Sequence, residues 1–206
     1  MYTYVLLFVC GFCLILYCLL IAESYDKIST IHEKLYDMWE KLKPVLEKHN
    51  VKYFADGGTL LGAYRDRQII AHDDDMDLGI MKEDEYKLFS KKFTDDLAKS
   101  HLKFDGKLYK FFPTDNLNDI FIDIFVYNLK GDKVDFVSEV HKTKYPNAYY
   151  MYNELFPLSS YNFGKNKIKG ANNPVKYFLR QYGENWYKPI KTHIHHKITK
   201  EDFKTY

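Results

Sequence analysis

The feature of this chain that most restricts its fold is a glycine pair followed, within about one supersecondary unit, by a run of acids. Residues 56–80 read DGGTLLGAYRDRQIIAHDDDMDLGI. Gly57 and Gly58 stand where an apparent strand gives way to a helix, and glycine there lets the backbone approach a ligand closely. The acids that follow are Asp73, Asp74, Asp75 and Asp77. The glycines suit a phosphate and the acids suit a divalent cation, so the stretch predicts metal-dependent chemistry on a phosphate ester.

Polar side chains after the glycine pair fit a phosphate site. Thr59 could cap the helix or donate its hydroxyl to a phosphate, and Arg65, further along, could balance phosphate charge. Taken alone, the pair also fits an ordinary Gly-Gly turn. The acidic run favours the phosphate interpretation, in which the substrate-binding residues are Gly57, Gly58, Thr59 and Arg65.

The end of the acidic run reads as the start of a strand. Side chains alternate along a strand, so Asp75 and Asp77 would share a face while the apolar residues next to Asp77 point into the core. Two carboxylates on one face can hold Mg²⁺ or Mn²⁺ beside phosphate oxygens. A solvated loop explains Asp73 and Asp74 adequately, but it explains the acids interleaved with core residues poorly.

A third acid, Asp123, lies inside the apolar stretch 120–127, IFIDIFVY. Burying an unpaired carboxylate there would cost several kcal/mol, so Asp123 needs a cation or strong hydrogen-bond donors. A hydrogen-bonded core aspartate or an exposed strand face is the alternative. We expect a shared metal, with Asp75, Asp77 and Asp123 as both metal ligands and catalytic residues.

The remaining pattern predicts a mixed α+β domain. Residues 24–49 read as an amphipathic stalk helix that Pro44 should kink or divide. Residues 82–100 read as one helix, and 102–112 as a hairpin. Further elements are predicted as strands at 51–55, 77–81, 120–127 and 134–137, and a helix at 173–182.

The first residues suggest a membrane anchor. Residues 4–22 are uncharged and almost wholly apolar, close to the ~20 residues that cross a bilayer as a helix. A cleaved signal peptide is the alternative, but no Lys or Arg precedes the run. All three cysteines lie inside it, so the rest of the chain has no disulfide framework. The sequence thus predicts an anchor over 1–23, a stalk over 24–49, a catalytic domain over 50–206, and a single-pass protein of the Golgi or ER membrane.

The charge is nearly balanced, with 30 basic and 28 acidic residues. No basic stripe stands out, so we expect no nucleic-acid partner.

Three motifs together resemble a known family. A glycine pair at a strand-to-helix junction, an Asp-x-Asp strand and a later single Asp resemble the nucleotidyltransferase fold. GGTLLGAYR followed by AHDDDMDLGI resembles the LicD family, which includes phosphocholine transferases and the fukutin and fukutin-related proteins. FIDIFVY is similar to the family's "IDIF" strand, and YFLRQYGENWYKPI to its closing element.

The resemblance implies a nucleotidyltransferase-like mixed sheet flanked by helices, preceded here by the transmembrane helix. It also implies transfer of a phosphoryl-linked alcohol, of the phosphocholine or ribitol phosphate type, from a CDP-activated donor to a glycan hydroxyl. Asp123 or an adjacent carboxylate would then be the base, with His72 as a further candidate.

Three alternatives share these residues. An Asp-x-Asp metal site also serves glycosyltransferases that use nucleotide sugars. A true nucleotidyltransferase would release diphosphate instead. A catalytically silent membrane-bound homologue would bind a partner or a glycan.

Overall fold

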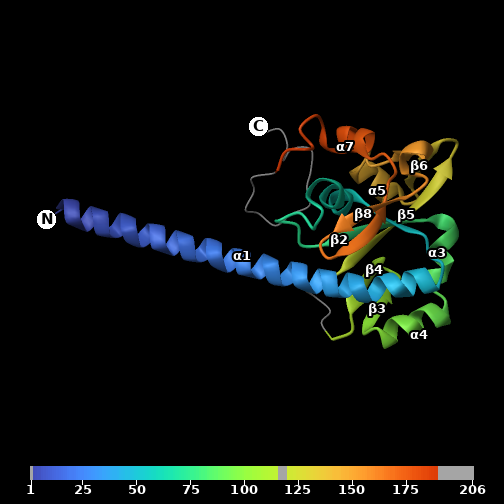
Figure 1. Cartoon of the computed structure of the whole chain (residues 1–206), viewed down its shortest axis with the longest axis horizontal. Coiled ribbons are helices and arrows are strands. Elements are labelled where there is room, and N and C mark those ends of the chain that lie inside the picture. Colours follow the sequence, from blue (N-terminus) through green and yellow to red (C-terminus); the bar gives the residue numbers. More distant parts are fainter. Residues whose placement is uncertain (1, 116–119, 190–206) are drawn as a thin grey trace.

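The computed structural model describes residues 2–115 and 120–189, with side chains described for 13–20 and from residue 28 onward. Its helices and strands are arranged as a mixed α+β fold (Figure 1). The helical elements are α1 (Tyr2–Lys48), α2 (Gly57–Leu61), the π-helix η1 (Gly62–Asp66), α3 (Lys82–Leu88), α4 (Lys91–Lys99), α5 (Glu139–Lys144), α6 (Tyr152–Leu155) and α7 (Val175–Tyr182). The strands are β1 (Tyr53–Ala55), β2 (Met76–Met81), β3 (Leu102–Asp105), β4 (Lys110–Pro113), β5 (Ile122–Lys130), β6 (Lys133–Phe136), β7 (Tyr150–Met151), β8 (Ser159–Phe163) and β9 (Asn166–Gly170).

The main sheet has seven strands. Its path is β1-β2-β5-β4-β3, while β6 pairs with β5 and β7 pairs with β6. Only β2 and β5 are paired in parallel among the described strands, which makes the sheet mixed as the sequence predicted.

The parallel pair places the predicted acids side by side. In its register Met76 faces Ile122 and Asp77 faces Asp123. Met76, Leu78 and Ile122 are fully buried, so the apolar positions of both strands belong to the core. The alternating sequence pattern therefore sets the acids at the start of two neighbouring strands.

The C-terminal part of the α1 helix packs onto the domain. Figure 1 shows its N-terminal part extending away from the domain. From residue 28 onward its buried side chains include Leu35, Trp39 and Leu42, and the Trp39 ring meets Tyr53 of β1 edge to face. The helix continues through Pro44 to Lys48, so the expected division at this proline is wrong.

The expected transmembrane helix is also wrong. Among the described residues, none of the helices combines the length and the apolarity that crossing a bilayer requires. From residue 28 onward, α1 alternates charged positions with side chains buried against the domain. This finding corrects the predictions of a membrane anchor and of a single-pass Golgi or ER membrane protein.

The predicted helix over 82–100 is two helices, α3 and α4. Ser90 breaks it, because its hydroxyl oxygen accepts the N–H of Phe93 and thereby caps the start of α4. Because of this break, the aromatic residues of the two helices do not share one buried face. Phe93 is buried, whereas Tyr86 and Phe89 are exposed. The hairpin formed by β3 and β4 and the helix α7 match the sequence prediction.

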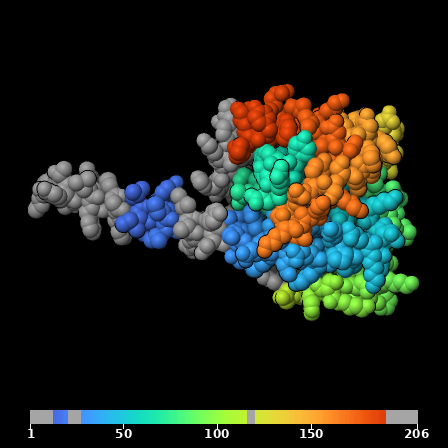
Figure 2. All heavy atoms as spheres, viewed as in Figure 1, coloured from blue at the N-terminus to red at the C-terminus, as the bar shows by residue number. Residues whose placement is uncertain are grey.

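Strands β8 and β9 form a second, two-stranded antiparallel sheet. Figure 2 shows this hairpin (orange) between the C-terminal part of α1 and the α2–η1 segment. Phe163 of β8 packs edge to face on Tyr36 of α1. This hairpin was not predicted from the sequence.

Candidate functional site

The structure brings the three predicted metal ligands together. One carboxylate oxygen each from Asp75, Asp77 and Asp123 lies within 4.8 Å of the others. Asp75 and Asp77 are buried, and the Asp123 side chain is 13% exposed. Asp73, Asp74 and Asp75 form a second such group, so the two groups share Asp75. Oxygen-only ligands in this number fit a hard divalent cation.

A lysine of the chain also reaches this cluster. Lys110 of β4 places Nζ 2.8 Å from Asp123 Oδ1. The same ammonium lies 3.3 Å from the centre of the Phe121 ring, a cation–π contact. The sequence analysis missed Lys110, because it did not predict that the hairpin strand β4 pairs with β5 and sets Lys110 opposite Asp123.

The glycine pair lets two acidic side chains approach the backbone. A methyl group on Gly58 would lie 2.6 Å from Asp73 Oδ2, and one on Gly57 would lie 3.0 Å from Asp77 Oδ2. Gly57 has a φ of +52°, which disfavours any other residue. The turn and the acids therefore lie side by side, and the missing side chains of the glycines make room for carboxylates.

Of the two polar residues predicted to bind phosphate, Thr59 contacts the acidic cluster and Arg65 contacts a different segment. Thr59 is buried, and its Oγ1 accepts the backbone N–H of Asp77 over 2.8 Å, which ties α2 to β2. Arg65 is bidentate to Asp66 and donates to the carbonyls of Trp186 and Lys188, so its guanidinium fastens the segment after α7. Thr59 therefore adjoins the acidic cluster, whereas Arg65 is engaged elsewhere.

A buried carboxylate that the sequence analysis did not single out lies just before the glycines. Asp56 accepts hydrogen bonds from three phenols, those of Tyr127, Tyr150 and Tyr177, over 2.5, 2.7 and 3.4 Å. The Tyr150 and Tyr177 rings are stacked 4.2 Å apart. The Asp56 N–H also donates to the Asp77 carbonyl. These hydrogen bonds hold Asp56 in place and so fix the start of the glycine turn.

Burial is the largest cause of the pKa shifts of Asp56 and its three tyrosine partners. Desolvation raises the pKa of Asp56 above its usual value, while the three phenols and the Gly57 N–H act in the opposite direction. Burial likewise raises the pKa of each of the three tyrosines, so they remain neutral donors.

The α1 helix supports the acidic loop. His32 Nε2 lies 2.7 Å from the backbone oxygen of Asp73. The hydroxyl oxygen of Tyr36, one turn further along, accepts the backbone N–H of Ile69, which precedes the acidic run, over 2.9 Å. The helix that the sequence predicted as a stalk therefore also positions the loop that carries the acids.

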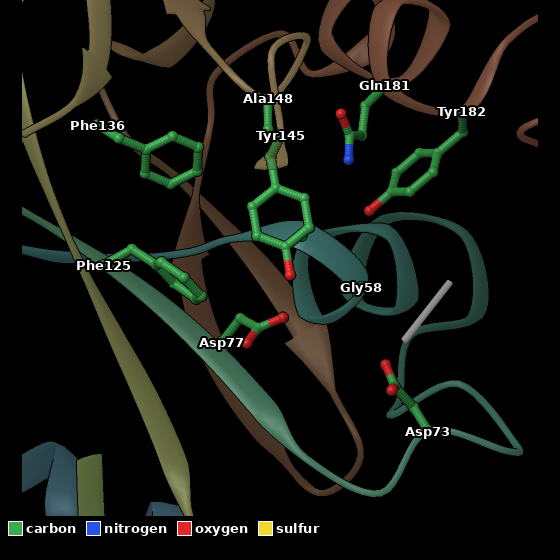
Figure 3. Close-up of a pocket in the computed structure, with 10 residues that line it drawn as sticks. Gly58, Asp73, Asp77, Phe125, Phe136, Tyr145, Ala148, Gln181 and Tyr182 are labelled. Atoms are coloured by element: carbon green, nitrogen blue, oxygen red, sulfur yellow. The ribbon is translucent and has the colours of Figure 1, made fainter. Parts of the chain in front are cut away.

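A narrow pocket opens over the glycines and the acids. Figure 3 shows Asp73 and Asp77 on one side of it and Tyr145, Gln181 and Tyr182 on the other. Phe125, Phe136 and Ala148 complete its apolar wall. Its free space is ≈ 50 Å³. A larger ligand bound here would extend beyond the pocket.

A mixed sheet with a glycine turn and with acids on two adjacent parallel strands fits the nucleotidyltransferase fold. The family model for the LicD/FKTN/FKRP nucleotidyltransferase domain matches residues 50–173. The chain therefore belongs to the LicD family, whose membership supports transfer of phosphate-containing groups in general.

Two relatives have no described activity. An uncharacterized protein of Rickettsia typhi is 36% identical over 184 residues, which cover 84% of this chain and 56% of the relative. An uncharacterized protein of Rickettsia prowazekii is 32% identical over 167 residues, covering 78% of this chain and 60% of the relative. The chain thus spans less than two thirds of either relative.

Proposed function

We propose that the protein transfers a phosphoryl-linked alcohol, of the phosphocholine or ribitol phosphate type, from a CDP-activated donor to a glycan hydroxyl. The observation that carries this proposal is the meeting of Asp75, Asp77 and Asp123, with Asp77 and the Gly57–Gly58 turn lining the same narrow pocket. Family membership supports the general reaction class. We assign the catalytic domain to residues 50–206 and the stalk to residues 24–49.

The residues present fit a divalent cation, either Mg²⁺ or Mn²⁺. Asp75, Asp77 and Asp123 would hold it, because their oxygens already lie within 4.8 Å of one another. When bound, such a cation supplies charge neutralisation for a diphosphate and for the leaving CMP.

The chain's own residues would orient the donor and accept a proton. Gly57 and Gly58 line the pocket, and because they lack side chains the carboxylates of Asp77 and Asp73 can stand beside the turn where the donor phosphates would bind. Thr59 keeps Asp77 in place through the 2.8 Å hydrogen bond to its N–H. Arg65 contributes indirectly, by holding the segment that follows the pocket residues Gln181 and Tyr182.

The reaction breaks a phosphoanhydride bond and forms a phosphodiester. The acceptor hydroxyl oxygen attacks the donor phosphorus that carries the alcohol, and a new P–O bond forms. The P–O bond to CMP breaks, and its electron pair leaves on the CMP phosphate. The proton of the acceptor hydroxyl passes to a carboxylate, with Asp123 or an adjacent acid as the base.

Product analysis tests the proposal. The full chain is incubated with Mg²⁺ or Mn²⁺, a glycan acceptor mixture, and CDP-choline, CDP-ribitol or a UDP-sugar. The expected result is metal-dependent CMP release with a CDP-alcohol, lost in Asp77→Asn and kept in the exposed control Asp132→Asn. Release of UDP would indicate a glycosyltransferase, and release of diphosphate from CTP a true nucleotidyltransferase. No turnover and no nucleotide binding by a folded protein would indicate a silent homologue.

A further inference from the structure

A second and larger cavity lies on the Asp123 side of the acidic cluster. Its volume of ≈ 570 Å³ falls within the range of small-molecule binding pockets, roughly 300–1,000 Å³. It shares two wall residues, Phe125 and Tyr145, with the narrow pocket over the glycines. Asp77 lines the narrow pocket and Asp123 lines the larger one, so the acidic cluster stands between the two cavities.

The charged groups of the larger cavity leave an excess of positive charge. Lys110 is paired with Asp123, and Glu85 is paired with Lys82 and accepts the Tyr109 hydroxyl. Two further lysines that line the cavity, Lys107 and Lys144, form no ion pair with any residue in the described part of the chain.

These two lysines come from different elements. Lys107 belongs to the turn between β3 and β4, and Lys144 ends α5. His141, half-buried on α5, also lines the cavity and meets the Phe125 ring at 5.1 Å. Aromatic walls with a few cationic groups at the rim suit a ligand that has both an apolar ring face and an anionic group.

The position of the cavity indicates which substrate it takes. In phosphoryl transfer the attacking and leaving oxygens lie roughly in line through the phosphorus. If the donor phosphates lie by Gly57 and Asp77, the attacking hydroxyl comes from the other side of the cluster, where Asp123 faces the larger cavity. This step rests on the proposed function.

We propose that the larger cavity is the acceptor site and that it selects a sugar carrying an anionic group, held by Lys107 and Lys144. A phosphate and a carboxylate share the required chemistry. An uncharged sugar would lack the ionic contacts and would bind more weakly.

Direct binding to the full chain tests this inference with three sugars that differ at one carbon. The probes are glucose, glucose 6-phosphate and glucuronate, titrated into the protein by calorimetry at low ionic strength, where exposed charges are least screened. We expect one or both anions to bind more tightly than glucose, and the tighter one identifies the preferred group. Reversal of both lysines, Lys107→Glu with Lys144→Glu, should weaken anion binding by roughly tenfold, because two attractions become repulsions. The matched control reverses two exposed lysines outside the cavity, Lys92→Glu with Lys165→Glu, and should change nothing.

The outcomes separate this inference from the proposed function. CDP binding in the presence of Mn²⁺ is measured on the same proteins and should be unchanged by the cavity lysines. The inference is overturned if neither anion binds below roughly 10 mM, or if both bind no better than glucose. It is also overturned if the lysine reversal weakens CDP and spares the sugar anions, which would make the cavity part of the donor site. Lysine-dependent anion binding without any CDP binding would support the cavity and reject the CDP-dependent reaction.

Discussion

Lys110 Nζ lies 2.8 Å from Asp123 Oδ1, so a cation of the protein itself already holds one of the three clustered carboxylates. The lysine is 24% exposed at its side chain and also covers the Phe121 ring. A divalent cation bound by Asp75, Asp77 and Asp123 would draw on the same carboxylate. Lys110 and the metal therefore compete for Asp123.

Replacing Lys110 with Met should tighten metal binding. The change removes the competing ammonium and keeps an apolar side chain against Phe121. The expected gain in Mn²⁺ affinity is about three- to tenfold, the size of one partly exposed ion pair. Calorimetric titration of Mn²⁺ measures it, with Lys92→Met as the control. Weaker binding in Lys110→Met would show instead that the lysine positions Asp123 for the metal.

The effect of Asp77→Asn on the melting temperature should depend on whether a metal ion is present. Without metal the variant should melt no lower than the wild type, because removing one of three neighbouring carboxylates relieves like-charge repulsion. With Mg²⁺ or Mn²⁺ the wild type should gain stability and the variant should gain little, because ligand binding to the folded state is what raises the melting temperature. Thermal melts over a metal series measure both effects. An equal metal response in the two proteins would remove Asp77 from the ligand set.

Thr59→Val should lower the free energy of unfolding, whereas Thr59→Ser should not. Valine keeps the shape of threonine but leaves the buried Asp77 N–H without the acceptor that it has at 2.8 Å. A lost partner of this kind costs about 1–3 kcal/mol. Urea denaturation measures the loss, and metal titration shows whether Asp77 is displaced. Similar stabilities for the valine and serine variants would mean that the N–H finds another acceptor.

The core of the site could be predicted from local sequence patterns. Asp75 and Asp77 are two residues apart at the start of a strand, and Asp123 interrupts an apolar strand that pairs beside it. Strand periodicity alone fixes which side chains share a face. The glycine pair could be found in the same way, because it precedes these acids in one continuous stretch of sequence.

Other parts depend on contacts that no local pattern records. The three tyrosines on Asp56 lie 71, 94 and 121 residues away from it in the chain. Tyr150 lies in a segment that gave no site signal, and Tyr177 begins the closing element without having been singled out as a site residue. The transmembrane prediction rested on one apolar run of the sequence, whereas none of the described helices has both the length and the apolarity to cross a membrane.

Among the three tyrosines, Tyr150→Phe should cost more stability than Tyr177→Phe. The Tyr150 hydroxyl donates to Asp56 over 2.7 Å, whereas the Tyr177 hydroxyl is 3.4 Å from the same oxygen. We expect a loss of about 1–3 kcal/mol for Tyr150→Phe and under about 1 kcal/mol for Tyr177→Phe. Both rings stay stacked in the variants, so packing is matched. Chemical denaturation measures the two losses, and the reverse order would mean that the longer contact is the stronger one in solution.

The pH dependence of stability should report the buried Asp56 carboxyl. Its pKa in the folded protein is raised above 3.8 by desolvation, so the folded state takes up the proton at a higher pH than the unfolded chain does. The protonated carboxyl therefore stabilises the fold fully below the unfolded value, and this contribution is lost as the pH rises through the folded value. Asp56→Asn cannot titrate at this position. The stability of the wild type relative to Asp56→Asn should consequently fall as the pH rises above 3.8, and then level off. Urea denaturation of both proteins over a pH series measures this difference. A difference that grows with pH would mean that the three phenol donors outweigh burial and hold the carboxylate in its charged form.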